Sequence, residues 1–116
     1  MGEGAAPKCQ YSTICFTVWD NSTLIQVPLK DEIVIGRSAP DEPIDIDLNP
    51  FNAHLLGVSR KHAIIKPLPT ACVLIDLDST NGTFINGNNL IPRQPYLLKS
   101  GDEIQIAGVY LQVSLY

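Results

Sequence analysis

The sequence lacks any long apolar run, and this absence limits where the chain can act. Its longest apolar stretches are only a few residues, whereas a membrane-spanning helix needs about 20. No signal-peptide pattern is present, and Ala6 breaks the myristoylation pattern that Gly2 would open. We therefore expect a cytoplasmic protein with no membrane partner.

Basic residues are also scarce. Lys and Arg number 8 against 12 Asp and Glu, which gives a net charge of −4. This balance predicts no nucleic-acid partner, because binding to phosphate backbones needs a basic surface. Three of the eight basic residues nevertheless fall in two loops, at Arg37, Arg60 and Lys61.

Cysteine is rare and shows no pairing pattern. The three cysteines, Cys9, Cys15 and Cys72, lie in apolar or strand-like surroundings without a CxxC motif, which predicts reduced, buried thiols. Neither His54 nor His62 has a metal-type partner at a useful spacing. We therefore expect no metal and no cofactor.

The sequence contains no convincing helix. Nine prolines are spread along it, and apolar residues recur at every second position or in short runs, as in strands. The Asn86-Gly87 dipeptide predicts a hairpin with a type I′ turn, and a further turn is expected at residues 20–22. Besides the two strands of that hairpin, strands are predicted at residues 11–19, 23–27, 32–35, 44–48, 61–68, 72–77, 95–98, 103–107 and 110–115.

About eleven short strands separated by turns are typical of an all-β sandwich. At 116 residues the chain is predicted to form one domain, residues 9–116, after a flexible lead at residues 1–8. The acidic run of Asp41, Glu42, Asp45 and Asp47 is interpreted as a solvated strand face.

Three loops share a chemistry that suits an anion. Gly36-Arg37 ends a strand with a guanidinium, and residues 57–62 place a hydroxyl, two cations and an imidazole before another strand. Residues 79–82, Ser-Thr-Asn-Gly, offer hydroxyls and a carboxamide. These loops contain donors with hardly a carboxylate among them, which is the set that a phosphate dianion needs.

The motifs Gly36-Arg37, Ser59-Arg60-x-His62, Ser79-Thr80-Asn81-Gly82-Thr83, Asn86-Gly87 and Gly101-Asp102-x-Ile104 resemble those of a forkhead-associated (FHA) domain in order and spacing. The resemblance covers residues 11–116. It implies an eleven-stranded β-sandwich of two twisted, mainly antiparallel sheets, whose loops at one end bind phosphothreonine peptides.

The resemblance also implies a role for each matching residue. Four residues would contact the phosphate: Arg37, Ser59, Arg60 and Thr80. Arg37 would reach either the phosphate or the adjacent peptide backbone. Asn81 would hold the peptide main chain, and Asn86 would shape the slot for the threonine methyl group. Three residues would support the site, His62 by bracing the Ser59 loop: Gly36, His62 and Gly82.

The chain departs from the family mainly in length. Between Arg37 and Ser59 lie 21 residues, more than the family commonly has. The extra segment, residues 49–57, is expected beside the peptide groove, where it either adds specificity or covers the site. The expected partner is a phosphothreonine-containing protein, or a phosphothreonine elsewhere in the same parent chain.

Two other interpretations compete with a phosphate-binding module. Ser59 and His62 suggest a hydrolase, but Lys61 breaks the G-x-S-x-G pattern and no P-loop or metal cluster is present, so an enzyme is not expected. The second alternative is a protein–protein module that ignores phosphate and pairs through a sheet face or an edge strand, such as residues 44–48.

Overall fold

A computed structural model describes residues 9–19 and 23–116. The lead expected at residues 1–8 and the turn expected at residues 20–22 lie outside this part of the chain. The described residues contain one short helical segment, the 3-10 helix η1 (Asn49–Phe51), and no helix among them is long and apolar enough to cross a membrane.

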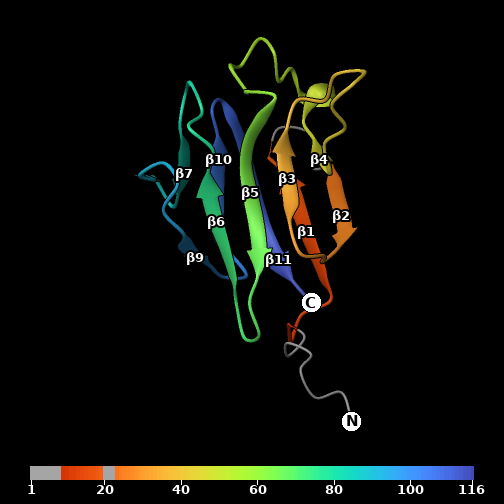
Figure 1. The fold of residues 1–116 in the computed structure, drawn as a ribbon, viewed down its shortest axis with the longest axis vertical. Coiled ribbons are helices and arrows are strands. Elements are labelled where there is room, and N and C mark those ends of the chain that lie inside the picture. The colour runs from red at the N-terminus through yellow and green to blue at the C-terminus, as the bar shows by residue number, and fades with distance from the viewer. Residues whose placement is uncertain (1–8, 20–22) are drawn as a thin grey trace.

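In the described part of the chain eleven strands form two packed sheets, which confirms the predicted all-β sandwich (Figure 1). The strands are β1 (Thr13–Val18), β2 (Leu24–Pro28), β3 (Ile33–Gly36), β4 (Ile46–Asp47), β5 (Lys61–Pro67), β6 (Cys72–Asp76), β7 (Thr83–Ile85), β8 (Asn88–Asn89), β9 (Tyr96–Leu98), β10 (Glu103–Ile106) and β11 (Val109–Leu115).

The six-stranded sheet has the order β2-β1-β11-β10-β7-β8, and the five-stranded sheet has the order β4-β3-β5-β6-β9. Apart from the parallel pair β3–β4, the paired strands are antiparallel. Because side chains alternate across a strand, each sheet turns one apolar row inward. Fully buried residues from both sheets make the core, among them Phe16, Ile35, Ile65, Leu74, Ile104 and Leu111.

The strand expected at residues 44–48 is shorter than predicted: β4 covers only Ile46–Asp47, and the aspartates of this stretch bind groups near the end of β3. Asp45 Oδ2 accepts the Val34 N–H at 2.9 Å, and Asp47 accepts the Ser38 hydroxyl at 2.7 Å. Burial raises the pKa of each carboxyl, but these hydrogen bonds, with Lys30 beside Asp45, outweigh it and lower the pKa overall. Asp45 and Asp47 are half-buried, so this part of the acidic run is only partly solvated and its carboxylates take part in the fold.

Strand register brings the candidate loops to one end of the sandwich. Lys61, the first residue of β5, lies opposite Gly36 at the end of β3. Ala63 pairs with Asp76, the last residue of β6. Since antiparallel neighbours begin and end at the same edge, the loops after β3, before β5 and after β6 all emerge at the end opposite the C-terminus (Figure 1).

The three cysteines are free, as expected, with Cys15 and Cys72 buried and Cys9 half-buried. Burial, together with the neighbouring Cys9, raises the pKa of the Cys72 thiol to about 11. The Cys72 sulfur is therefore protonated and shielded in the folded domain.

We expect iodoacetamide at pH 8 to alkylate Cys9 in the folded protein well before Cys15 and Cys72, because only an accessible thiolate reacts. In urea all three thiols should react. Peptide mass spectrometry under both conditions measures the difference. Native labelling of Cys72 as fast as Cys9 would contradict the packing of β6 in the core.

Candidate functional site

Gly36 allows two loops to approach closely at the end of β3. A Cβ atom at this position would lie 1.9 Å from the Arg60 carbonyl oxygen, so any side chain would displace the backbone of the Ser59 loop. The next residue, Arg37, donates its backbone N–H to the same oxygen at 3.0 Å. Gly36 therefore supports the site by permitting this contact, which no larger residue could.

The Arg37 side chain is anchored through a single nitrogen of its guanidinium group. Its Nε donates to the Val58 carbonyl at 3.1 Å, which fixes the direction of the guanidinium plane. Its two Nη groups have no partner among the described residues, so they remain available to a bidentate oxyanion. Arg60 is exposed and its side chain has no partner in the described part of the chain.

His62 joins the Ser59 loop to the loop after β6. The imidazole is fully buried, and its Nδ1 accepts the Ser59 N–H at 3.0 Å while Nε2 lies 2.8 Å from the Gly82 carbonyl. Since Nδ1 accepts, the proton of the neutral ring is on Nε2 and is donated to Gly82. Burial lowers the pKa of His62, against the Gly82 hydrogen bond and the charge of Asp76, which raise it.

Ser59 and Thr80 meet across the two joined loops. The Thr80 N–H lies 3.3 Å from Ser59 Oγ and donates to it, which leaves the hydroxyl proton of Ser59 free for a ligand. The Thr80 side chain is exposed beside this contact. Direct contacts therefore hold together the loops that carry the predicted phosphate contacts, Arg37, Ser59, Arg60 and Thr80.

Asn81 reaches the extra segment between Arg37 and Ser59. Its Nδ2 donates to the Gly57 carbonyl at 2.8 Å, which leaves Oδ1 and one N–H for a peptide. Gly57 has φ +85°, and a Cβ there would lie 2.4 Å from Asn81 Nδ2. Sequence reasoning gave Gly57 no role in the site; its position just before Val58-Ser59 was the only signal.

Asp76 organises the loop after β6, and sequence reasoning also missed it. The carboxylate is buried; Oδ1 accepts the Ser79 and Thr83 hydroxyls at 2.5 and 2.6 Å, and Oδ2 accepts the Ser79 N–H at 3.1 Å. The available signal was an aspartate at the end of an apolar strand, followed by a serine three residues later. These bonds fix the loop that carries Thr80 and Asn81.

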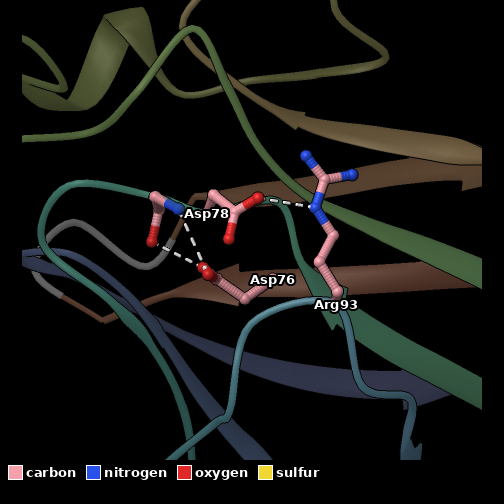
Figure 2. Close-up of polar contacts among 4 residues, drawn as sticks. Asp76, Asp78 and Arg93 are labelled. Atoms are coloured by element: carbon pink, nitrogen blue, oxygen red, sulfur yellow. Dashed lines mark hydrogen bonds and ion pairs between the residues drawn. The ribbon is translucent and has the colours of Figure 1, made fainter.

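Arg93 braces the same loop from the outside. Figure 2 shows its guanidinium directed at Asp78, with Nε 2.7 Å from Asp78 Oδ2, while its backbone N–H donates to the Asp76 carbonyl at 2.9 Å. Both side chains of the ion pair are exposed, so it contributes only about 0–1 kcal/mol to stability.

The Asn86 side chain is hydrogen-bonded to residues at the start of β10. It and Gly87 have φ of 49° and 84°, as the type I′ turn requires. The Asn86 side chain donates to Asp102 Oδ1 at 3.0 Å and accepts the Glu103 N–H at 2.9 Å. These bonds brace the β7–β8 turn against β10, and the methyl-slot role of Asn86 stays a prediction.

Gly82, the third support residue, connects several elements. Its N–H donates to Ser79 Oγ at 3.0 Å, and its carbonyl receives both the His62 ring and the Ala107 N–H. Among the described residues no group of three His, Cys, Asp or Glu side chains could hold a metal ion. The free groups of the joined loops are mainly hydrogen-bond donors, which suits an anion.

The neutral imidazole gives the fold a predicted dependence on pH. Because the folded pKa of His62 lies below the unfolded value of about 6.5, the unfolded chain binds the proton more readily. The stabilisation from His62 is therefore complete above about pH 6.5. It falls as the pH drops towards the folded pKa, by up to about 1.4 kcal/mol per pH unit.

Urea unfolding at pH 7.5 and pH 5.5 tests this dependence. His62→Gln should be less stable than the parent at pH 7.5 but should lose less stability on acidification. The exposed His54 supplies the matched control, since His54→Gln should keep the pH dependence of the parent. An unchanged pH dependence in His62→Gln would contradict the assignment of a neutral buried imidazole.

Curated proteins similar to this chain are much longer than it. Protein FraH of Nostoc sp. strain PCC 7120 is 36% identical over 83 residues, which cover 71% of this chain and 28% of FraH. The E3 ubiquitin-protein ligase RNF8 of Rattus norvegicus is 38% identical over 58 residues, covering 49% of this chain and 12% of RNF8. The chain thus matches less than a third of the length of either relative.

A solved structure has the same fold over nearly its whole length. A chain from a structural and functional analysis of phosphothreonine-dependent FHA domain interactions matches with a TM-score of 0.71 and 25% identity, over 90% of this chain and 98% of that one. The family model for the FHA domain matches residues 33–107, which run from β3 to the end of the β10 strand and include every motif described above. The chain therefore belongs to the FHA domain family.

Proposed function

We propose that this domain is a phosphopeptide-binding module that recognises phosphothreonine on a partner protein. The observation that carries the proposal is the set of uncommitted donors on the joined loops: the Nη groups of Arg37, the Ser59 hydroxyl and the Arg60 side chain. Charge-assisted hydrogen bonds from such donors are the strong contacts that a phosphate dianion makes. Solved FHA domains with phosphothreonine-dependent interactions support it.

In this proposal the residues divide the ligand between them. Arg37, Ser59, Arg60 and Thr80 hold the phosphate, and the carboxamide of Asn81 holds the peptide main chain through its free Oδ1 and N–H. The loops are already fixed by His62 and Asp76, so little conformational freedom is lost on binding. A partner in trans and a phosphothreonine elsewhere in the parent chain satisfy the same chemistry.

The same geometry argues for binding without catalysis. A serine nucleophile needs a base on its hydroxyl, whereas His62 Nδ1 accepts the backbone N–H of Ser59 and Nε2 is engaged by Gly82. The Ser59 hydroxyl instead accepts from Thr80. We therefore propose that the domain holds the phosphate intact.

A phosphate-independent module that uses the strand at residues 44–48 has less support. β4 has only two residues, and Asp45 and Asp47 are used by backbone groups of this chain. An edge this short presents few free N–H and C=O groups to a partner strand.

Replacement of Arg37 by Ala should weaken binding of a phosphothreonine peptide about 30-fold or more, because a charge-assisted pair to the phosphate is worth about 2–5 kcal/mol. The measurement is fluorescence anisotropy with a degenerate phosphothreonine peptide pool and its unphosphorylated counterpart. Only the phosphorylated pool should bind the parent domain.

Lys99→Ala is the matched control for charge. Lys99 directly follows β9, and the last residue of β9, Leu98, pairs with Cys72 at the start of β6. Lys99 therefore lies at the end of the sandwich away from the phosphate loops, and the Lys99→Ala variant should bind like the parent. Equal binding of both pools, unchanged in Arg37→Ala, would overturn the phosphate site and favour the phosphate-independent module.

Phosphoserine in place of phosphothreonine should weaken binding about 10-fold, since one methyl group in a fitted slot is worth roughly 1–3 kcal/mol. Paired peptides that differ only in this methyl group measure the effect. Asn86→Ala should reduce the preference, because in this proposal Asn86 shapes the slot that receives the methyl group. Equal affinity for both peptides would exclude a methyl slot.

A further inference from the structure

The outward faces of the two sheets differ in composition. Side chains alternate along a strand, so each sheet has one face in the core and one turned away from it. On β1, β10 and β11 of the six-stranded sheet, the outward residues are mostly polar: Thr13, Thr17, Glu103, Gln105, Gln112 and Ser114. On β3, β5 and β6 of the five-stranded sheet, they are mostly aliphatic: Val34, Ile64, Val73 and Ile75. This second face therefore lacks the polar surface that a solvated sheet face normally has.

The aliphatic side chains of the five-stranded sheet form one continuous patch. Ile64 lies opposite Val34 on β3 and opposite Ile75 on β6, and these three strands lie side by side in Figure 1. Val73, two residues from Ile75 and on the same face, lies opposite Leu97 on the edge strand β9. Leu97 is 61% exposed, and the other four residues are half-buried. These five residues are the aliphatic patch.

The strands under the patch have the sequence pattern of strands covered on both faces. Residues 33–35, 63–65 and 72–75 are uninterrupted apolar runs, whereas residues 111–115 of the six-stranded sheet alternate between apolar and polar. Alternation is typical of a strand with one solvated face, and continuous runs are typical of a strand buried on both faces. The pattern indicates that another surface covers the aliphatic patch.

Charged residues border the patch in neutral pairs. The four ion pairs among the described residues all lie at the borders of this sheet: Lys30–Asp45, Lys61–Glu42, Lys66–Glu32 and Arg93–Asp78. Lys66 and Glu32, which are 3.3 Å apart, flank Ile64 and Val34 on the same face. The four cations cancel the four anions, so the net charge of −4 arises from residues outside this rim. An apolar centre with a polar rim is the usual anatomy of a protein interface.

We propose that the aliphatic patch packs against the same patch of a second copy of this chain, as a two-fold dimer. In such a dimer one surface faces itself, so a rim of a single sign would repel its own copy. The rim of this patch carries both signs and no net charge, although the chain as a whole is acidic. Two sheet faces rich in β-branched side chains interdigitate when they pack about 10 Å apart.

The size of the patch predicts a weak, reversible dimer. Five strands spaced about 4.8 Å apart make a face only about 20 Å wide. Stable interfaces bury about 1,200–2,000 Å² in total, and a face of this width lies at or below the lower limit. The phosphate loops lie at the end of the sandwich and not on this face, so they stay accessible in the dimer (Figure 1).

Sedimentation equilibrium tests the association directly. Between about 10 μM and about 1 mM, the range expected for a weak complex, the weight-average mass should rise from 12.7 kDa towards twice that value. A mass that stays at 12.7 kDa throughout would overturn the proposal. Growth beyond the dimer would also contradict it, because a two-fold interface closes with two copies.

Two substitutions in the patch locate the contact. Leu97→Lys and Ile64→Thr should each weaken dimerisation at least about 10-fold, because a two-fold interface contains every substitution twice. Leu24→Lys is the matched control, since Leu24 is 59% exposed but lies on β2, the edge strand of the other sheet. It should associate like the parent. Urea unfolding of the three variants separates a lost contact from a lost fold.

The variants also give outcomes that contradict the proposal. Unchanged association in both Leu97→Lys and Ile64→Thr would show that the copies meet through another surface. An equal loss in Leu24→Lys would show that the effect is not specific to the aliphatic patch. Phosphothreonine peptide binding by Leu97→Lys should match the parent, because the patch and the phosphate loops are separate surfaces.

Discussion

The site depends on one buried imidazole. His62 accepts the Ser59 N–H and donates to the Gly82 carbonyl, so a single ring fixes two loops that leave different strands. A phosphate bound by short hydrogen bonds needs its donors within a few tenths of an ångström of their final places. Folding already fixes these donors in place, so the conformational entropy is lost before a ligand binds. The His62 ring must be neutral, because Nδ1 can accept the Ser59 N–H only when it carries no proton.

The second constraint is that an acidic domain must keep its carboxylates hydrogen-bonded to its own groups near a site for an anion. The carboxylate of Asp76 accepts three hydrogen bonds, two from Ser79 in the loop that follows it and one from Thr83 at the start of β7. Asp45 and Asp47 bind backbone groups near β3. These acids stabilise the loops and strands around the site while their lone pairs are occupied. Arg37 and Arg60 keep free donors at the same end, which is how a chain of net charge −4 can present an anion site.

The extra segment is in direct contact with the loop that carries Thr80 and Asn81. The carbonyl of its last residue, Gly57, accepts a hydrogen bond from the Asn81 side chain, and the residue before it, Leu56, lines a recess beside the β10–β11 turn. The phosphate contacts proposed for this site would be common to every phosphothreonine peptide and would not distinguish one partner from another. Discrimination between partners must come from contacts outside the phosphate group.

The sequence by itself determined the strands, the Asn86-Gly87 turn and the three donor loops. Each is encoded locally, by alternating apolar residues, by positive φ in a two-residue turn, or by adjacent polar side chains. Only the tertiary structure decided the reasons for Gly36 and Gly57, the buried role of Asp76, the shortening of β4 and the recess beside Leu56. Most of these depend on contacts between residues far apart in the chain, which strand register and sheet packing create and which no local pattern contains.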